Sequence, residues 1–203
     1  QDDQNIKKRV LKSEYRNGNW SHPSSLSEAI SPEGSDVVRV NVKMDDSGNI
    51  IVVWMQQNVS SKYQVYKSEY RNGLWTHPLD RNAHFSLNLN YINSFDIAMD
   101  NKENSIIVWD QFVNDYAQIF KSEYRNGLWT YPLDSADNIS ADGTSAFNPS
   151  VAMDNHDNAL VVWEQGDNID SISGRTQIFM SEYRHGSWNN PDSLTDISRL
   201  MEN

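Results

Sequence analysis

Apolar residues gather in three runs that end in the same way, with a tryptophan followed two positions later by a glutamine. These runs are residues 51–56 (IVVWMQ), 106–111 (IIVWDQ) and 160–165 (LVVWEQ). A turn-forming stretch rich in Asp and Asn precedes each run, at residues 45–49, 100–104 and 154–158. Because nearly every position of a run is apolar, we expect a strand that is buried on both faces and forms a hairpin with the strand before its turn.

A second pattern alternates with the first and centres on an Asn-Gly pair. Lys-Ser-Glu-Tyr-Arg-Asn-Gly-x-Trp spans residues 12–20, 67–75 and 121–129, and residues 180–188 repeat it with Met at the start and His-Gly at the turn. The tryptophans that close the four copies are 55, 54 and 59 residues apart. Asn-Gly between two β-type runs predicts a hairpin, because a type I′ turn needs positive φ at both central residues.

The two patterns together form one repeating unit of four antiparallel strands. A single sheet of four short strands cannot cover two apolar faces, so neighbouring units must stack face to face. Radial stacking around a channel predicts an all-β chain of four-stranded antiparallel blades of the β-propeller type. A linear β-solenoid is the alternative, but its repeats are usually shorter.

The repeat predicts about three and a half blades within a single repeat domain. The units are a half blade at residues 6–23, blades at 37–78, 92–132 and 147–191, and a linker-like tail at 192–203. Known propellers have four or more blades. We therefore expect either self-association, in which another copy covers the exposed edges, or a longer parent chain.

Composition narrows the range of partners. The 203 residues carry a formal net charge of −11 with a pI near 4.7, so we expect no nucleic-acid partner, since phosphate backbones are bound by basic surfaces. The sequence contains no window of 18 apolar residues, so we expect no membrane insertion. Residues 1–4 lack the features of a signal peptide. The acidic, Asn- and Ser-rich, cysteine-free composition favours an exported bacterial protein, placed outside the cell, in the periplasm or at the cell surface.

The turn motif Ser-Glu-Tyr-Arg-Asn-Gly-x-Trp resembles the Asp-box of sialidase-like propellers, with Tyr at the position of the Asp and a Gly-to-Trp spacing one residue shorter. Nearly the whole chain is similar to the Trp-x-Gln repeats of uncharacterised exported bacterial proteins. The resemblance implies a propeller fold, which hosts enzymes, lectins and scaffolds alike.

Residues that recur in every unit are expected to have a structural role, because a catalytic centre is a single asymmetric constellation. We therefore predict no catalytic residue, no cofactor and no metal, and we expect the Tyr and Trp rings to pack across the hairpins. The recurring rings are Trp20, Trp54, Trp75, Trp109, Trp129, Trp163, Trp188, Tyr15, Tyr70, Tyr124 and Tyr183.

The segments that differ between units lie on the opposite face from the Asn-Gly turns. They are the loops between second and third strands and the linkers between units, and binding concentrates in loops carried on a rigid scaffold. The candidate ligand-binding residues of this face are Gln56, Gln111, Gln165, Asp110, Glu164 and Tyr116. Amides beside aromatic rings suit sugars, although each Gln could instead bind backbone groups of the protein.

Two functions remain open at this point. The first is a non-catalytic binding module of an exported bacterial protein, with a glycan or a protein as the ligand. The second is a fragment of a sialidase-like glycan-processing enzyme, whose catalytic residues would lie partly outside this sequence.

Overall fold

The computed structural model describes residues 7–166 and 175–195, and within these ranges the regular structure is almost entirely β. The first hairpin and the second sheet comprise β1 (Glu14–Arg16), β2 (Asn19–Ser21), β3 (Val37–Met44), β4 (Ile50–Gln57), β5 (Tyr63–Arg71) and β6 (Leu74–Thr76). The third sheet comprises β7 (Ile92–Met99), β8 (Ser105–Val113), β9 (Tyr116–Arg125) and β10 (Leu128–Thr130). The fourth comprises β11 (Ala146–Met153), β12 (Ala159–Gly166), β13 (Thr176–Arg184) and β14 (Ser187–Asn189). Two short 3-10 turns, Leu26–Glu28 and Ser135–Asp137, lie in the linkers.

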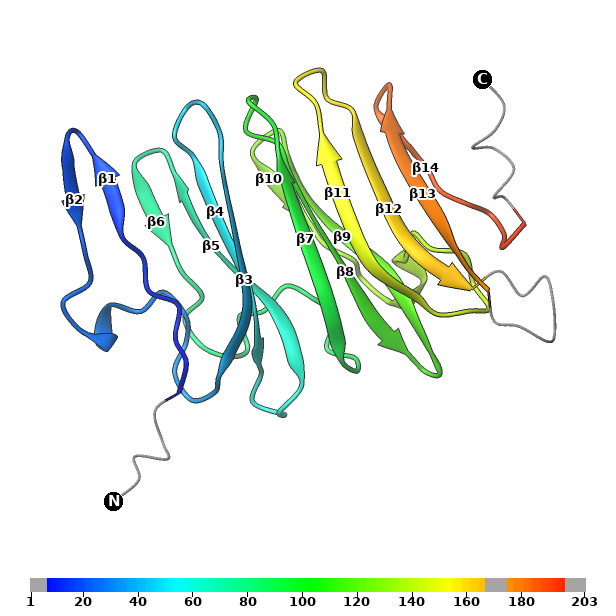
Figure 1. Ribbon diagram of the computed structural model, residues 1–203, viewed down its shortest axis with the longest axis horizontal. Helices are drawn as coiled ribbons and strands as arrows, with labels where there is room; N and C mark the ends of the chain where they lie inside the picture. The colour runs from blue at the N-terminus through cyan, green and yellow to red at the C-terminus, as the bar shows by residue number, and fades with distance from the viewer. Residues whose placement is uncertain (1–6, 167–174, 196–203) are drawn as a thin grey trace.

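Every sheet is an antiparallel meander in which each strand pairs with the next along the chain. One sheet has the two strands β1 and β2, and three sheets have four strands each. The sheets stand side by side in chain order, from β1–β2 at one end to β11–β14 at the other (Figure 1). The expectation of four-stranded, propeller-type blades, about three and a half in number, is confirmed. No helix among the described residues is long and apolar enough to cross a membrane.

The hairpins between the last two strands of each sheet have the backbone that their sequence requires. Asn17, Asn72, Asn126 and His185 have φ of 52–53°, and the glycine after each has φ of 81–83°. Positive φ at both central positions is the type I′ geometry, which glycine and asparagine adopt at low cost. This turn fixes the register that places Tyr70 opposite Trp75 and Tyr124 opposite Trp129.

The second strand of each four-stranded sheet carries apolar residues to both faces. In the third sheet, Ile107 and Trp109 pack against the second sheet, while Ile106 and Val108 pack against the fourth. All four side chains are fully buried. This explains the near-continuous apolar run of β8, because the third sheet lies between two neighbouring sheets.

Adjacent sheets are also joined at their outer strands by a set of contacts that we call the joint. In each joint a glutamate of one sheet forms ion pairs with a Lys and an Arg two residues away and accepts a hydrogen bond from a tryptophan indole of the next sheet. The Lys lies over that tryptophan ring and the Arg over the tyrosine beside it, with cation-to-centroid distances of 4.5–5.0 Å and 3.8–3.9 Å. The three joints are Lys12, Glu14 and Arg16 with Trp75 and Tyr70; Lys67, Glu69 and Arg71 with Trp129 and Tyr124; and Lys121, Glu123 and Arg125 with Trp188 and Tyr183.

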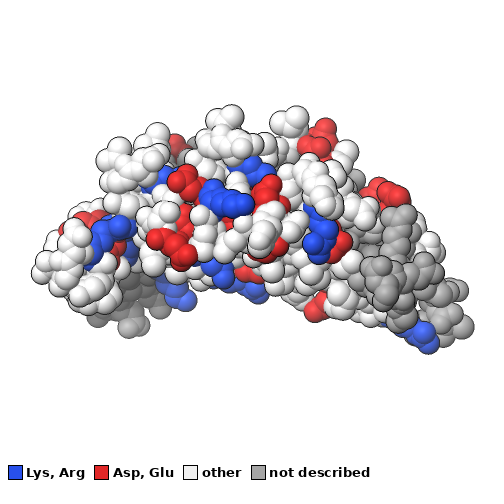
Figure 2. All heavy atoms as spheres, turned by 90° about the horizontal axis from the view of Figure 1, so that it is seen from above, with Lys and Arg blue, Asp and Glu red and all other residues white. Residues whose placement is uncertain are grey.

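The face formed by the hairpin turns is an arch on which basic and acidic side chains lie next to one another (Figure 2). The negative net charge of the chain therefore does not appear here as a single-sign patch.

Candidate functional site

The three glutamines that the sequence placed at the loop-rich rim are buried, with exposures of 0–1%. Each side-chain oxygen accepts a hydrogen bond from the indole of the tryptophan two residues earlier, at 3.2, 3.2 and 2.9 Å. Each side-chain nitrogen donates to two carbonyls of the preceding linker, with the shorter bonds at 2.6–2.7 Å. The amides of Gln56, Gln111 and Gln165 thus tie a strand to its linker and make their hydrogen bonds inside the protein.

Asp110 is also enclosed, with an exposure of 1%. Its carboxylate accepts hydrogen bonds from the backbone nitrogens of Asn93, Ser94 and Asn148, at 2.8, 2.9 and 3.2 Å. These contacts hold the irregular start of β7 and connect it to β11 of the next sheet. Asp110 therefore supports the backbone from within.

Glu164 and Tyr116 are the two candidates that solvent reaches. Glu164 is exposed, and Tyr116 is 46% exposed. Tyr116 lines a cavity of about 470 Å³ together with Asn114, Asp115 and the linker residues Asn138 and Asp142. The structure thus brings Tyr116 to a hollow on the predicted face. The corresponding loop of the fourth sheet, at residues 167–174, lies outside the described residues.

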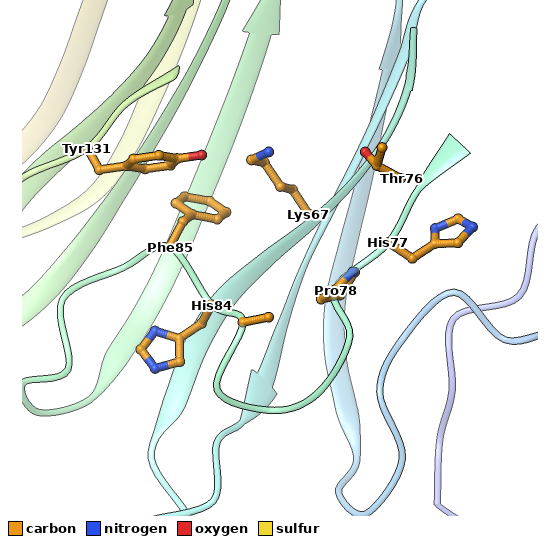
Figure 3. Close-up of a pocket in the computed structure, with 8 residues that line it drawn as sticks. Lys67, Thr76, His77, Pro78, His84, Phe85 and Tyr131 are labelled. Atoms are coloured by element: carbon orange, nitrogen blue, oxygen red, sulfur yellow. The ribbon is translucent and has the colours of Figure 1, made fainter. Parts of the chain in front are cut away.

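A second cavity, which we call the inter-sheet cleft, lies between the second and third sheets and has a volume of about 490 Å³. Strand β5, the end of β6 and the linker between β6 and β7 form most of it, and one residue comes from the end of β10. Its lining residues are Lys67, Thr76, His77, Pro78, Ala83, His84, Phe85 and Tyr131. In Figure 3, Tyr131 and Phe85 form one wall, Thr76 and His77 lie on the other side, and Lys67 rises between them.

The wall made by Tyr131 and Phe85 is fixed by packing beneath it. The two rings are 6.1 Å apart, and Tyr131 stacks on Trp129 with an interplanar angle of 16°. Phe85 meets the buried ring of Trp109 edge to face at 5.6 Å. Rings held in this way keep an apolar surface available without losing rotamer freedom when a ligand binds.

Tyr131 occupies a position at which the other three repeats carry a different side chain. In those repeats a serine hydroxyl of the third strand has a partner two residues after the hairpin tryptophan. The pairs are Ser13 with His22, Ser68 with His77, and Ser181 with Asn190, at 2.9–3.0 Å. The tyrosine ring offers no such partner, and the buried hydroxyl of Ser122 makes no hydrogen bond in the structure. A buried hydroxyl without a partner is destabilising, so this departure from the repeat has a cost in stability.

The ionisable groups of the cleft are held mostly in their neutral forms. Burial raises the pKa of Tyr131 to about 12, with Glu69 contributing. Burial lowers the pKa of His77 and His84 below the usual histidine value, and Lys12 adds to the effect at His77. At neutral pH the cleft therefore offers a phenol and two uncharged imidazoles, and the ammonium of Lys67 is already paired with Glu69.

Sequence reasoning missed the inter-sheet cleft because its residues come from different repeats and, apart from Lys67, lie outside the repeated motifs. The available signal was the break in a regular pattern. His22 and His77 each precede a proline, and Tyr131 stands before Pro132 at the equivalent place. Asn190 also replaces the histidine but still bonds Ser181, so Tyr131 marks the one copy in which the shared hydrogen bond is lost.

No protein-family model matches the sequence, and no curated protein does. Solved structures resemble the fold. An ulvan lyase from a new family of polysaccharide lyase, bound to -[GlcA(1-4)Rha3S]-, aligns with a TM-score of 0.52 at 12% identity over 88% of this chain and 47% of its own. A thermostable family-43 glycoside hydrolase aligns with a TM-score of 0.47 at 13% identity, over 79% of this chain and 59% of its own. A fucose lectin from Kordia zhangzhouensis, solved with methyl-fucoside, aligns with a TM-score of 0.42 at 11% identity, over 75% of this chain and 97% of its own.

The chain spans about half the length of the lyase it resembles. At 12% identity this likeness concerns the fold alone. The chain is thus an all-β protein of stacked, propeller-type sheets.

Proposed function

We propose that this protein is a non-catalytic glycan-binding module of an exported bacterial protein with sialidase-like repeats, and that it holds a sugar in the inter-sheet cleft. The single observation that carries the proposal is the exchange at Tyr131. The repeat gives up the hydrogen bond of a buried serine at this one place and gains an aromatic wall on a cavity. Stability exchanged for an exposed ring is typical of a functional position.

The chemistry of the cleft suits a sugar. Aromatic rings contact the C–H faces of a pyranose, and hydroxyls and imidazoles bind its hydroxyl groups. Phe85 and Tyr131 supply the rings, while Thr76 and the Tyr131 hydroxyl supply groups that both donate and accept. An apolar hollow with a few polar groups of this kind is the usual form of a small-ligand site.

The lining favours holding a sugar over cleaving it. Glycoside hydrolysis needs two carboxylic groups that flank the bond. Among the described residues that line the inter-sheet cleft there is one ammonium and no carboxylate. The nearby carboxylate of Glu69 is engaged by Lys67, Arg71 and Trp129.

The cavity beside Tyr116 belongs to the same proposal as a further contact region on the loop face. Tyr116 provides a half-exposed ring, and Asn114 and Asp115 provide planar polar groups next to it. Glu164 reaches solvent on the following sheet. An extended glycan can touch more than one hollow of a repeating surface, which raises its affinity through linked contacts.

A glycan array followed by calorimetry with the best sugar tests the proposal. We expect Tyr131→Ala to weaken binding by at least about tenfold, which corresponds to the loss of one stacking contact. Leu79→Ala is the control, because Leu79 lies on the linker between β6 and β7 that borders the cleft, is 96% exposed and lines no described cavity. Silence across the array, or equal affinity of the Tyr131→Ala and Leu79→Ala proteins, contradicts a glycan site in the cleft.

A further inference from the structure

The first two-stranded sheet has an edge that no described strand covers. The segment before β1 takes the place of a third strand, because its contacts match those of β5 and β9. The backbone nitrogen of Val10 donates a hydrogen bond of 2.9 Å to the hydroxyl of Ser31. The backbone nitrogens of Val65 and Ile119 donate in the same way to the hydroxyls of Ser86 and Ser140. The carbonyl of Val10 accepts from Ile30 at 2.8 Å, as that of Ile119 accepts from Ile139.

In the other sheets the opposite edge of this strand is paired along its whole length. Strand β5 pairs with β4, β9 with β8 and β13 with β12. No described strand pairs with residues 8–16 on that side. The backbone there presents a row of open hydrogen-bonding groups, which is the template that an incoming strand uses.

An exposed apolar stripe lies beside this open edge. Val40, Val42 and Met44 on β3 are 54%, 56% and 68% exposed. Ile97, which takes the place of Val42 in the third sheet, is 1% exposed because the second sheet covers it. The stripe is therefore the surface against which the inner strands of a preceding sheet pack.

The repeat also predicts which side chains the inner strands of a preceding sheet carry. In the three four-stranded sheets a tryptophan stands opposite an aromatic residue of the third strand: Trp54 opposite Tyr66, Trp109 opposite Phe120 and Trp163 opposite Phe179. Leu11 takes that position before β1 and is 39% exposed. The residues one and three positions before the tryptophan, Val108 and Ile106 in the third sheet, pack against the following sheet.

We propose that residues 8–16 and the stripe of Val40, Val42 and Met44 form a docking site for a β-hairpin of this repeat's inner-strand type. The second strand of the hairpin pairs with residues 8–16, sets a tryptophan opposite Leu11, and sets aliphatic side chains opposite Lys12 and Glu14. Those aliphatic side chains cover the stripe. A second copy of this chain does not fit the site, because its described inner hairpins are already paired within their own sheets.

The site is tested by supplying the hairpin. Residues 92–115 run directly into Tyr116 of β9, and Lys7 is the equivalent of Tyr116. A variant in which a copy of residues 92–115 replaces residues 1–6 should therefore complete the first sheet. We expect amide exchange at Arg9, Leu11 and Ser13 to slow by at least about 100-fold, as it does when an open edge becomes a central strand. The control carries serine at the copied positions of Ile106 and Val108 and should show little protection.

A synthetic peptide of residues 92–113 added to the full chain is a second measurement that does not depend on how the extended variant folds. Protection of the same amides by the peptide supports the site. Absence of protection in both experiments overturns it. Protection that appears in the unextended chain and grows with its concentration also overturns it, because another copy would then be the occupant.

Discussion

The indole nitrogen of Trp129 donates a hydrogen bond of 2.8 Å to the carboxylate of Glu69, across the boundary between the third and second sheets. The same carboxylate pairs with Lys67 and Arg71 of its own strand, so one glutamate organises a tryptophan and two cations. Hydrogen bonds to a charged, largely buried acceptor are the stronger kind. The joints are therefore expected to contribute to the stability of the stack beyond the burial of apolar surface.

Glu69→Gln removes this charge but keeps the shape of the side chain. We expect the free energy of unfolding to fall by about 1.5–3 kcal/mol, the range for hydrogen bonds to charged groups. Glu182→Gln is the matched control, since Glu182 occupies the same place in the last sheet and no described tryptophan donates to it. Its loss should cost less than about 0.5 kcal/mol. Denaturant unfolding of both variants measures the difference, and equal losses would contradict the role of the joint.

The joints also predict how stability depends on pH. Burial alone would raise the pKa of Glu123, but Lys121, Arg125 and Trp188 together lower it below its ordinary value of 4.5. The pKa of Glu14 is lowered in the same way by Lys12, Arg16 and Trp75 against the effect of burial. A carboxyl with a depressed pKa in the folded state stabilises it fully above its unfolded pKa and loses that effect as the pH falls through the folded pKa.

We therefore expect the melting temperature to decline as the pH falls below about 4.5. Glu123→Gln should lower the melting temperature at pH 7 and make the acid decline shallower. Melting curves between pH 7 and pH 3 provide the measurement. A decline of the same steepness in the variant would show that Glu123 does not titrate within this joint.

Tyr131→His separates stability from binding. The imidazole should restore to Ser122 the hydrogen bond that His77 makes to Ser68. We expect a gain of about 1 kcal/mol, or about 2–4 °C in melting temperature for a chain of this size. The same variant removes the phenol from the cleft wall, so sugar affinity should fall. Tyr131→Phe is the control, because phenylalanine keeps the ring and gives Ser122 no partner. A Tyr131→His protein that is more stable and keeps full affinity for the sugar would contradict the assignment of the cleft as the sugar site.

Trp109→Ala tests the core between the second and third sheets. Trp109 is fully buried and contacts Phe85 and Phe120. Loss of this ring should lower the free energy of unfolding by about 3–5 kcal/mol. Trp20→Ala removes a ring that is 62% exposed and should cost less than about 1 kcal/mol. Similar losses in the two variants would show that burial does not determine how much each tryptophan contributes to the free energy of unfolding.

The fold could be predicted from the sequence because local signals and the repeat agree with each other. Asn72-Gly73 fixes a hairpin by backbone conformation alone, and the run that contains Trp109 is apolar at successive positions because two sheets cover it. Neither inference required knowledge of side-chain partners. Because the unit recurs several times, the same local prediction is made separately in each copy, and agreement between the copies supports it.

The candidate site could be predicted only in part, because the sequence does not show whether a polar side chain faces solvent or the protein. Gln111 and Tyr116 lie on the same face, but the Gln111 amide binds the Trp109 indole and linker carbonyls, whereas the Tyr116 ring is half exposed. The inter-sheet cleft depends on how close the rings of Phe85 and Tyr131, which come from two repeats, lie to each other. Tertiary packing sets the distance between them.

The near-identity of the three joints has a consequence for how such a chain evolves. Because every joint accepts the same Trp–Tyr pair and offers the same Lys–Glu–Arg strand, a duplicated unit arrives already compatible with both of its neighbours. Gene duplication can then lengthen the array in single steps, with no new interface to be invented. Selection is left free to change one linker position at a time, as the tyrosine before Pro132 illustrates.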